Sequence, residues 1–197
     1  MNRRDALKNT GFLAGAAVAL PTIFSLLESC TTENRLDWKP LFFTEIEAKT
    51  IAGVLDTILP RTETPGALDV KSDIFIDKVI AKTYDEAGQD KMRKDIAAFN
   101  TSCEQQYGNP FFLLKEADKI NVLKTAEANS GKFNPGIWGT TVGEQEPIGF
   151  YRAIKSMGIW AYTTSEEIGK NVLSYDPIPG AYQPCIPLSD VGNRWSL

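Results

Sequence analysis

The sequence contains no histidine, and this absence removes several kinds of catalytic and metal site. Serine–histidine–aspartate and cysteine–histidine catalysis need an imidazole base, and histidine zinc sites and histidine-ligated haem need an imidazole ligand. No pair of carboxylates stands out as a general acid and base, although catalysis by carboxylates alone remains open. The sequence also lacks a G-x-G-x-x-G dinucleotide motif and a calcium-loop spacing. We therefore expect no catalytic, cofactor-binding or metal-binding residue in this chain.

The three cysteines are assigned to two different roles. Cys30 follows Leu-Glu-Ser, which resembles a lipoprotein processing box and predicts lipidation at this residue. Cys103 and Cys185 then remain as an even pair, and in an oxidising compartment such a pair predicts a disulfide that staples the C-terminal tail to the body. Cys103 also lies on a helical apolar stripe, so a buried free thiol is the alternative.

The proline-rich tail carries aromatic residues that could bind a partner. Its motif Y-D-P-x-P-G-x-Y combines a rigid backbone with amphipathic rings, which give large contact areas at low entropic cost. The interface residues expected from this motif are Tyr175, Pro177, Pro179, Gly180 and Tyr182. The alternative is that both tyrosines pack on the chain's own helices.

Two tryptophans outside this motif are further interface candidates. Trp138 lies in a glycine-rich stretch over residues 129–147 that has no periodicity and predicts a long loop. Alternatively, Trp138 could be buried within the domain. Trp195 lies in the final G-N-R-W of the chain.

Helices must position these residues, and the clearest one is predicted over residues 44–59. Thr44 and Glu47 have the spacing of a capping box, and Ile51, Val54, Leu55, Ile58 and Leu59 form one apolar stripe. Pro60 ends this helix. The apolar stripe predicts that this helix packs against the others.

The same reading predicts further helices over residues 72–84, 90–107, 115–128, 148–161 and 164–173. Ser72 or Asp73 is expected to cap the first of them, Ala87-Gly88 to end it, Gly108 to end the second, and Thr164 to open the last with a capping box. Ala117, Ile120 and Leu123 are expected to face inward from the third. Arg61 is expected to form a local ion pair or loop clamp. The predicted fold class is therefore mainly α, a small irregular bundle of about five to six helices with a proline-rich extended tail.

The N-terminal residues have the parts of an export signal. Arg3, Arg4 and Lys8 precede the uncharged residues 9–27, which resemble a twin-arginine signal, the kind that exports folded cargo. We expect a signal peptide over 1–29, a tether over 30–41 and one helical domain over 42–197. A cleaved signal without a lipid, or an uncleaved membrane helix, is the alternative.

The overall charge argues against a nucleic-acid partner. Residues 1–29 hold three of the 21 basic and two of the 25 acidic residues, so the rest of the chain has a net charge of −5. A mildly acidic chain without a basic stripe is a poor ligand for phosphate backbones.

The ordered motifs L-D-x-I-L-P at 55–60 and T-x-T-P-G-A at 62–67 identify a family resemblance. Together with the acidic helix start, they resemble the small subunit (subunit 3) family of membrane-bound gluconate 2-dehydrogenase, over roughly residues 42–185. The resemblance implies a non-catalytic accessory subunit that stabilises and helps to export a partner. That partner would be a flavin-dependent dehydrogenase of the glucose-methanol-choline type, carrying FAD and oxidising a sugar, sugar acid or polyol.

The resemblance also implies where the complex works. Electrons would pass from the flavoprotein to a cytochrome c subunit with haem c and on to quinone, in the periplasm or cell envelope. The alternative function is a stand-alone envelope lipoprotein that binds a ligand or acts as a scaffold.

Overall fold

The computed structural model describes residues 38–131, 136–137, 140–141, 147–175, 178, 180 and 185–194. By its internal contacts the chain divides into Met1–Arg35 and Leu36–Leu197, and every described residue belongs to the second unit. No helix among the described residues is both long enough and apolar enough to cross a membrane.

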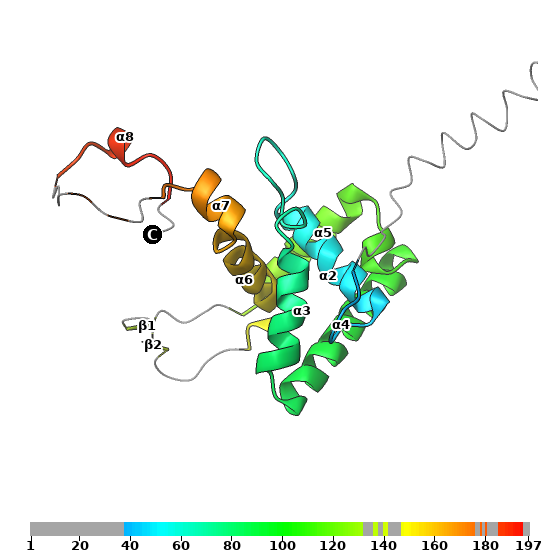
Figure 1. The fold of residues 1–197 in the computed structure, drawn as a ribbon. Coiled ribbons are helices and arrows are strands. Elements are labelled where there is room, and N and C mark those ends of the chain that lie inside the picture. Colours follow the sequence, from blue (N-terminus) through cyan, green and yellow to red (C-terminus); the bar gives the residue numbers. More distant parts are fainter. Residues whose placement is uncertain are drawn as a thin grey trace, which may run out of the picture. The chain divides into compact units, whose positions relative to one another are not determined.

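The helix α2, Glu45–Ile58, lies at the centre of the helical bundle (Figure 1). Thr44 and Glu47 form the predicted capping box, in which the Thr44 N–H donates to Glu47 Oε2 at 2.7 Å and the Glu47 N–H donates to Thr44 Oγ1 at 3.3 Å. Ile51, Val54 and Leu55 are fully buried. The cap therefore fixes where the helix begins, and its apolar stripe fixes which face turns inward.

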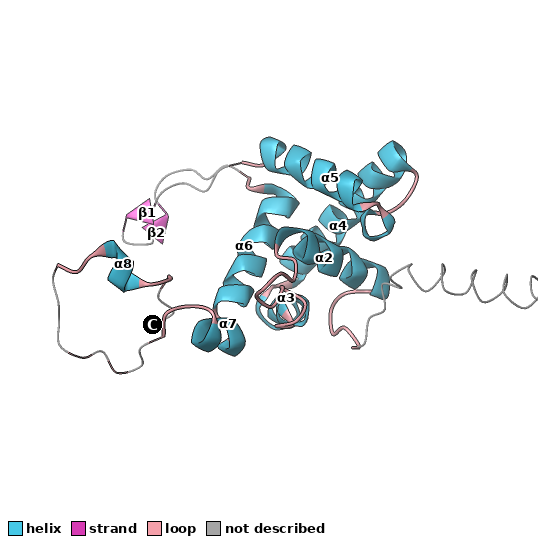
Figure 2. Ribbon diagram, turned by 90° about the horizontal axis from the view of Figure 1, so that it is seen from above, coloured by secondary structure: helices cyan, strands magenta, loops and turns pink. Residues whose placement is uncertain are grey.

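Four helices and a short 3₁₀ segment surround α2. They are α3 (Ser72–Thr83), α4 (Glu86–Tyr107), η1 (Phe111–Leu113), α5 (Glu116–Asn129) and α6 (Gly149–Thr163). All five contact α2, and Figure 2 shows α2 between α3 and α5. The mainly α prediction is confirmed.

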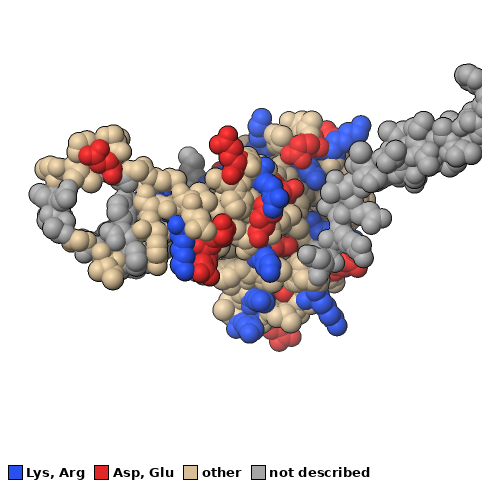
Figure 3. All heavy atoms as spheres, turned by 45° about the horizontal axis from the view of Figure 1, so that its top comes forward, with Lys and Arg blue, Asp and Glu red and all other residues tan. Residues whose placement is uncertain are grey.

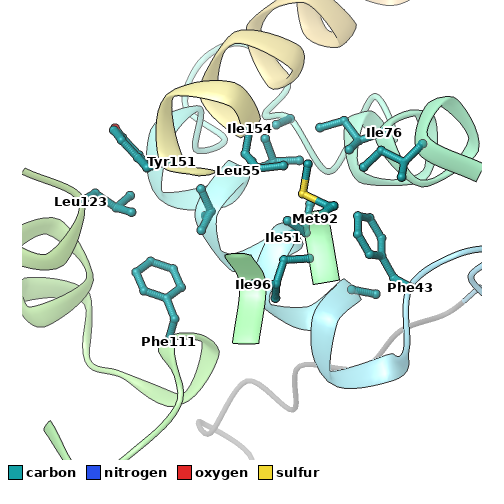
Figure 4. Close-up of a cluster of buried hydrophobic side chains, with 14 of the residues drawn as sticks. Phe43, Ile51, Leu55, Ile76, Met92, Ile96, Phe111, Leu123, Tyr151 and Ile154 are labelled. Carbon is teal, nitrogen blue, oxygen red and sulfur yellow. The ribbon is translucent and has the colours of Figure 1, made fainter. Parts of the chain in front are cut away.

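The core is built from large apolar side chains of α2 and of the elements around it. Figure 4 shows Ile51 and Leu55 of α2 among residues from the surrounding elements. These neighbours include Phe43, Ile76, Met92, Ile96, Phe111, Leu123, Tyr151 and Ile154. Full burial of such a side chain contributes about 1.5–3 kcal/mol, so this cluster is the main source of the fold's stability.

Close contact between α2 and α6 depends on a glycine. Gly158 of α6 is buried, and a Cβ added there would overlap Leu55 Cδ2. The missing side chain lets the two helices approach, because any larger residue would displace Leu55.

Several predicted boundaries are wrong. Lys71, with a left-handed φ of 60°, occupies the N-cap of α3 without a side-chain cap, so neither Ser72 nor Asp73 caps it. Ala87-Gly88 does not end a helix, because Asp85 accepts a hydrogen bond from the Gly88 N–H and starts α4 there. The predicted stop at Gly108 is confirmed by its left-handed φ of 78°.

The chain after α6 differs from its prediction in two details. The short helix α7, Glu166–Asn171, begins after Ser165, and Thr164 forms no capping box because its Oγ1 donates to the Trp160 carbonyl at 2.7 Å. A one-turn helix α8, Leu188–Val191, interrupts the tail that was predicted to contain no helix. In the predicted long loop, β1 (Gly136–Ile137) pairs antiparallel with β2 (Thr140–Thr141).

The predicted inner face of α5 is partly wrong. Leu123 is buried as expected, but Ile120 is exposed, and Val122 takes a buried position instead. The apolar positions of this helix are too evenly distributed for periodicity to identify one face.

The segment before α2 is held to α3 by two carboxylates. Asp77 is fully buried and accepts the backbone N–H groups of Leu41 at 2.7 Å, Phe42 at 3.0 Å and Phe43 at 2.9 Å. Asp73 accepts the indole N–H of Trp38 at 3.3 Å. Residues 38–41, assigned to the tether by the sequence, are therefore bonded to the helical body.

Candidate partner-binding surface

An exposed pair of aromatic rings lies where α3 meets α6. Phe75 and Trp160 contact edge to face, with ring centroids 5.1 Å apart and an interplanar angle of 71°. Phe75 is 37% exposed and Trp160 is 52% exposed. Large aromatic side chains left this open to water are typical of residues that are covered by a partner.

The local sequence explains why these two rings face outward. Ile76 and Ile80 lie on the buried face of α3, and Phe75 directly precedes Ile76 in the sequence. Ile154 and Ala161 lie on the buried face of α6, and Trp160 directly precedes Ala161. Successive helical residues are separated by about 100°, so both rings point to the rim of the α3–α6 contact.

A second contact extends this surface along the two helices. Tyr84, at the end of α3, places its hydroxyl 3.7 Å from the sulfur of Met157 on α6. The two contacts show that α3 and α6 run antiparallel. We call Phe75, Tyr84, Met157 and Trp160 the aromatic face.

A hollow lies beside this face at the junction of α6 and α7. Its volume is about 380 Å³, and its lining residues are Thr163, Thr164, Ser165, Glu166, Gly169, Lys170 and Tyr175. Glu166 and Lys170 form an ion pair at 2.7 Å. The hydrogen bond between them lowers the pKa of Glu166 and raises the pKa of Lys170. Tyr175, 40% exposed, is the one sequence-predicted interface residue that the described structure places at this hollow.

A cluster of charged side chains, separate from the aromatic face, joins α5 to α6. Glu127 accepts hydrogen bonds from Arg152 Nη2 and Lys155 Nζ, both at 2.8 Å. The hydrogen bond from Lys155 is the main reason why the pKa of Glu127 lies below its ordinary value. A smaller hollow of about 200 Å³ is lined by Arg152, Lys155, Ser156 and Ile159.

Arg61 forms the predicted loop clamp. Its Nε donates to Asp69 Oδ2 at 2.7 Å, and its Nη2 pairs with Asp69 Oδ1. Asp69 also accepts the Gly66 N–H at 2.7 Å, which closes the turn that contains Pro65-Gly66. The hydrogen bond from Arg61 to Asp69 is the main reason why the pKa of Asp69 lies below its ordinary value.

No cluster of three or more cysteine, aspartate or glutamate residues within the described part of the chain could hold a metal ion. The fully buried carboxylate, Asp77, is occupied by three backbone N–H groups. On the face in Figure 3, acidic and basic side chains are intermixed over the helices.

The other sequence-predicted residues have mixed outcomes. Gly180 is exposed, whereas Cys30, Trp138, Pro177, Pro179, Tyr182 and Trp195 lie outside the described residues. Cys103 and Cys185 are free thiols in this structure, so the predicted disulfide is absent from it. The physical reason is their placement: Cys103 is enclosed in the bundle, and Cys185 is exposed in the tail.

Motifs in the loops and the tail do not point to Phe75 and Trp160, because both residues lie within helices. The sequence feature that could have identified them is a large aromatic residue directly next to the buried apolar positions of its helix, but not one of those positions. Such a residue has no predicted place in the core.

Comparison with known proteins addresses the resemblance directly. No curated protein and no solved structure matches the chain. The sequence profile described as Gluconate 2-dehydrogenase subunit 3 matches residues 45–180, which run from the start of α2 past α7 into the tail and include the aromatic face and both hollows. The chain belongs to the gluconate 2-dehydrogenase subunit 3 family.

Proposed function

We propose that the chain is a non-catalytic accessory subunit of a membrane-associated, flavin-dependent dehydrogenase. The partner is a flavoprotein of the glucose-methanol-choline type that oxidises a sugar, sugar acid or polyol with its own FAD. The observation that carries this proposal is the family match, because it covers α2 to α7 and its name is that of a dehydrogenase subunit.

The geometry supports a binding role on the aromatic face. Phe75 and Trp160 are exposed yet already in contact with each other, so little side-chain entropy is lost when a partner covers them. The hollow lined by Tyr175 adds a concave surface at the junction of α6 and α7. Together they offer the anchor and the pocket that stable protein interfaces use.

The proposal includes a shared route of export. The twin-arginine-like N-terminus would carry a folded complex across the membrane, and lipidation at Cys30 would hold the complex at the envelope. A third subunit with haem c would accept the electrons. In this scheme the chain stabilises and delivers the flavoprotein and takes no part in the oxidation.

Purification of the tagged full-length chain from native membranes tests this function. We expect a yellow complex with flavin absorbance, a second and larger polypeptide, and dehydrogenase activity that the separated small subunit lacks. A colourless monomer would contradict the proposal and favour a stand-alone lipoprotein. Activity of the isolated chain on sugar acids would contradict it in favour of catalysis by carboxylates.

The lipid anchor has its own test. Intact mass and N-terminal peptide analysis of the mature protein should show Cys30 as the first residue with an attached lipid. A Cys30→Ser variant should be released from the membrane fraction when it is produced without the partner. A mature protein that begins elsewhere and carries no lipid would contradict this part alone.

A further inference from the structure

The smaller hollow and the larger one follow one another along a single stripe of α6. Arg152, Ser156, Ile159 and Thr163 are spaced at i, i+4, i+7 and i+11, which places them on one side of a helix. The first three line the hollow of about 200 Å³, and Thr163 begins the hollow of about 380 Å³. A partner segment lying along this stripe would meet both.

The smaller hollow carries an excess of positive charge. Arg152 and Lys155 share one carboxylate, that of Glu127, so the three groups together have a net charge of +1. Arg152 Nε is shielded from water and lacks a hydrogen-bond partner among the described residues. The side chains of Arg152 and Lys155 are 20% and 34% exposed beside Glu127, so a further acceptor can reach both cations from solvent.

The size and lining of the hollow restrict what could enter it. Sites for small-molecule ligands usually measure about 300–1,000 Å³, so a hollow of about 200 Å³ suits one side chain better. Ile159, which is partly exposed, supplies an apolar wall beside the two cations. An acidic side chain with an apolar neighbour matches both features.

We propose that this hollow binds an aspartate or glutamate side chain of the dehydrogenase subunit, with an apolar neighbour of that residue against Ile159. The inference rests on the proposed function and adds a specific, charge-dependent contact to it. Arg152 and Lys155 then hold two carboxylates, Glu127 from α5 and one from the partner. Such a contact fixes the register of the partner on α6, because a misplaced carboxylate loses both cations.

A serine-to-glutamate change within the hollow tests the proposal. Ser156→Glu places one of the chain's own carboxylates four residues from Arg152, where it occupies the hollow and repels an incoming carboxylate. Ser102→Glu on α4 is the matched control, because Ser102 is also an exposed helical serine and lies on another helix. Both variants should keep the circular dichroism and melting behaviour of the wild-type protein.

The readout is the affinity of the purified subunit for the dehydrogenase subunit that co-purifies with it. We expect Ser156→Glu to weaken binding by roughly tenfold or more, and Ser102→Glu to leave the affinity unchanged. Equal affinity of both variants with the wild-type protein would overturn the proposal. Because the complex itself would still form, that result leaves the proposed function intact, whereas failure of any complex to form contradicts the function.

Zero-length cross-linking identifies the chemistry of the contact. A carbodiimide should join Lys155 Nζ to an aspartate or glutamate of the partner, and Ser156→Glu should abolish that cross-linked peptide. Recovery of Lys155 joined solely to Glu127 or to another carboxylate of this chain would overturn the proposal.

Discussion

The backbone N–H of Phe42 donates a hydrogen bond of 3.0 Å to the carboxylate of Asp77, which is 0% exposed. The same carboxylate accepts the N–H groups of Leu41 and Phe43. A single side chain of α3 therefore binds three consecutive N–H groups of the segment that leads into α2.

Replacement of Asp77 should loosen this segment and destabilise the fold. Asp77→Ala leaves the buried N–H groups of Phe42 and Phe43 without their acceptor, and each buried, unsatisfied donor costs about 1–3 kcal/mol. We expect a loss of at least about 2 kcal/mol in the free energy of unfolding by urea, together with new proteolytic cleavage between residues 38 and 44. Asp90→Ala, at an exposed aspartate on α4, is the control and should change neither.

The contact between Gly158 and Leu55 gives a prediction about packing. Gly158→Ala should destabilise the protein by about 1–3 kcal/mol, because the new methyl group overlaps a fully buried leucine. Leu55→Val in the same chain should recover part of that loss by making room for the methyl group. Wild type, the two single variants and the double variant form a double-mutant cycle when their urea unfolding is compared. If the two changes in unfolding free energy simply add in the double variant, the direct contact is contradicted.

The sequence predicted the elements better than it predicted the polar contacts between them. The capping box at Thr44 and the stop at Gly108 depend on neighbouring residues, so local motifs identified both. Asp77 could not be assigned in this way, because its partners lie 34 to 36 residues earlier and an aspartate beside an apolar stripe ordinarily faces water. Thr164 was misread for a related reason: its hydroxyl bonds back to Trp160, and Ser165 takes the N-cap.

The sequence did not predict the candidate surface on α3 and α6. An interface rich in aromatic residues was expected, and the tail residue Tyr175 does lie at a hollow. The Phe75–Trp160 pair depends on how α3 and α6 pack, and no spacing within one helix contains that information.

The Glu127 cluster predicts how stability changes in acid. The folded-state pKa of Glu127 is lowered, mainly by the hydrogen bond from Lys155, so its contribution is complete above the ordinary value of about 4.5 and is lost as the pH falls through the folded-state pKa. Glu127→Gln removes the charge at every pH. The difference in unfolding free energy between wild type and Glu127→Gln should be at most about 1 kcal/mol near pH 6 and should disappear towards pH 3. A difference that grows in acid would contradict this assignment.

The two described cysteines should differ sharply in reactivity. Burial raises the pKa of Cys103 to about 11, and the charge of Glu104 adds to this effect, whereas Cys185 is exposed. At pH 8 a thiol-alkylating reagent should modify Cys185 in the native protein and Cys103 after unfolding, as peptide mass analysis would show. Protection of both residues until a reductant is added would instead indicate the disulfide expected from the sequence.

The aromatic face predicts a change that harms assembly more than folding. Trp160→Ala removes an exposed side chain whose contact with Phe75 is worth about 0.5–1.5 kcal/mol, so the variant should still fold. Loss of a tryptophan at the centre of an interface typically costs about 2 kcal/mol or more, which corresponds to roughly thirtyfold weaker binding of the dehydrogenase subunit. Leu113→Ala on η1 is the control, because Leu113 is similarly exposed and lies on an element away from the aromatic face. If both variants bind as tightly as the wild-type protein, the partner covers another part of the chain, since a tryptophan at the contact could not be removed without a loss of affinity.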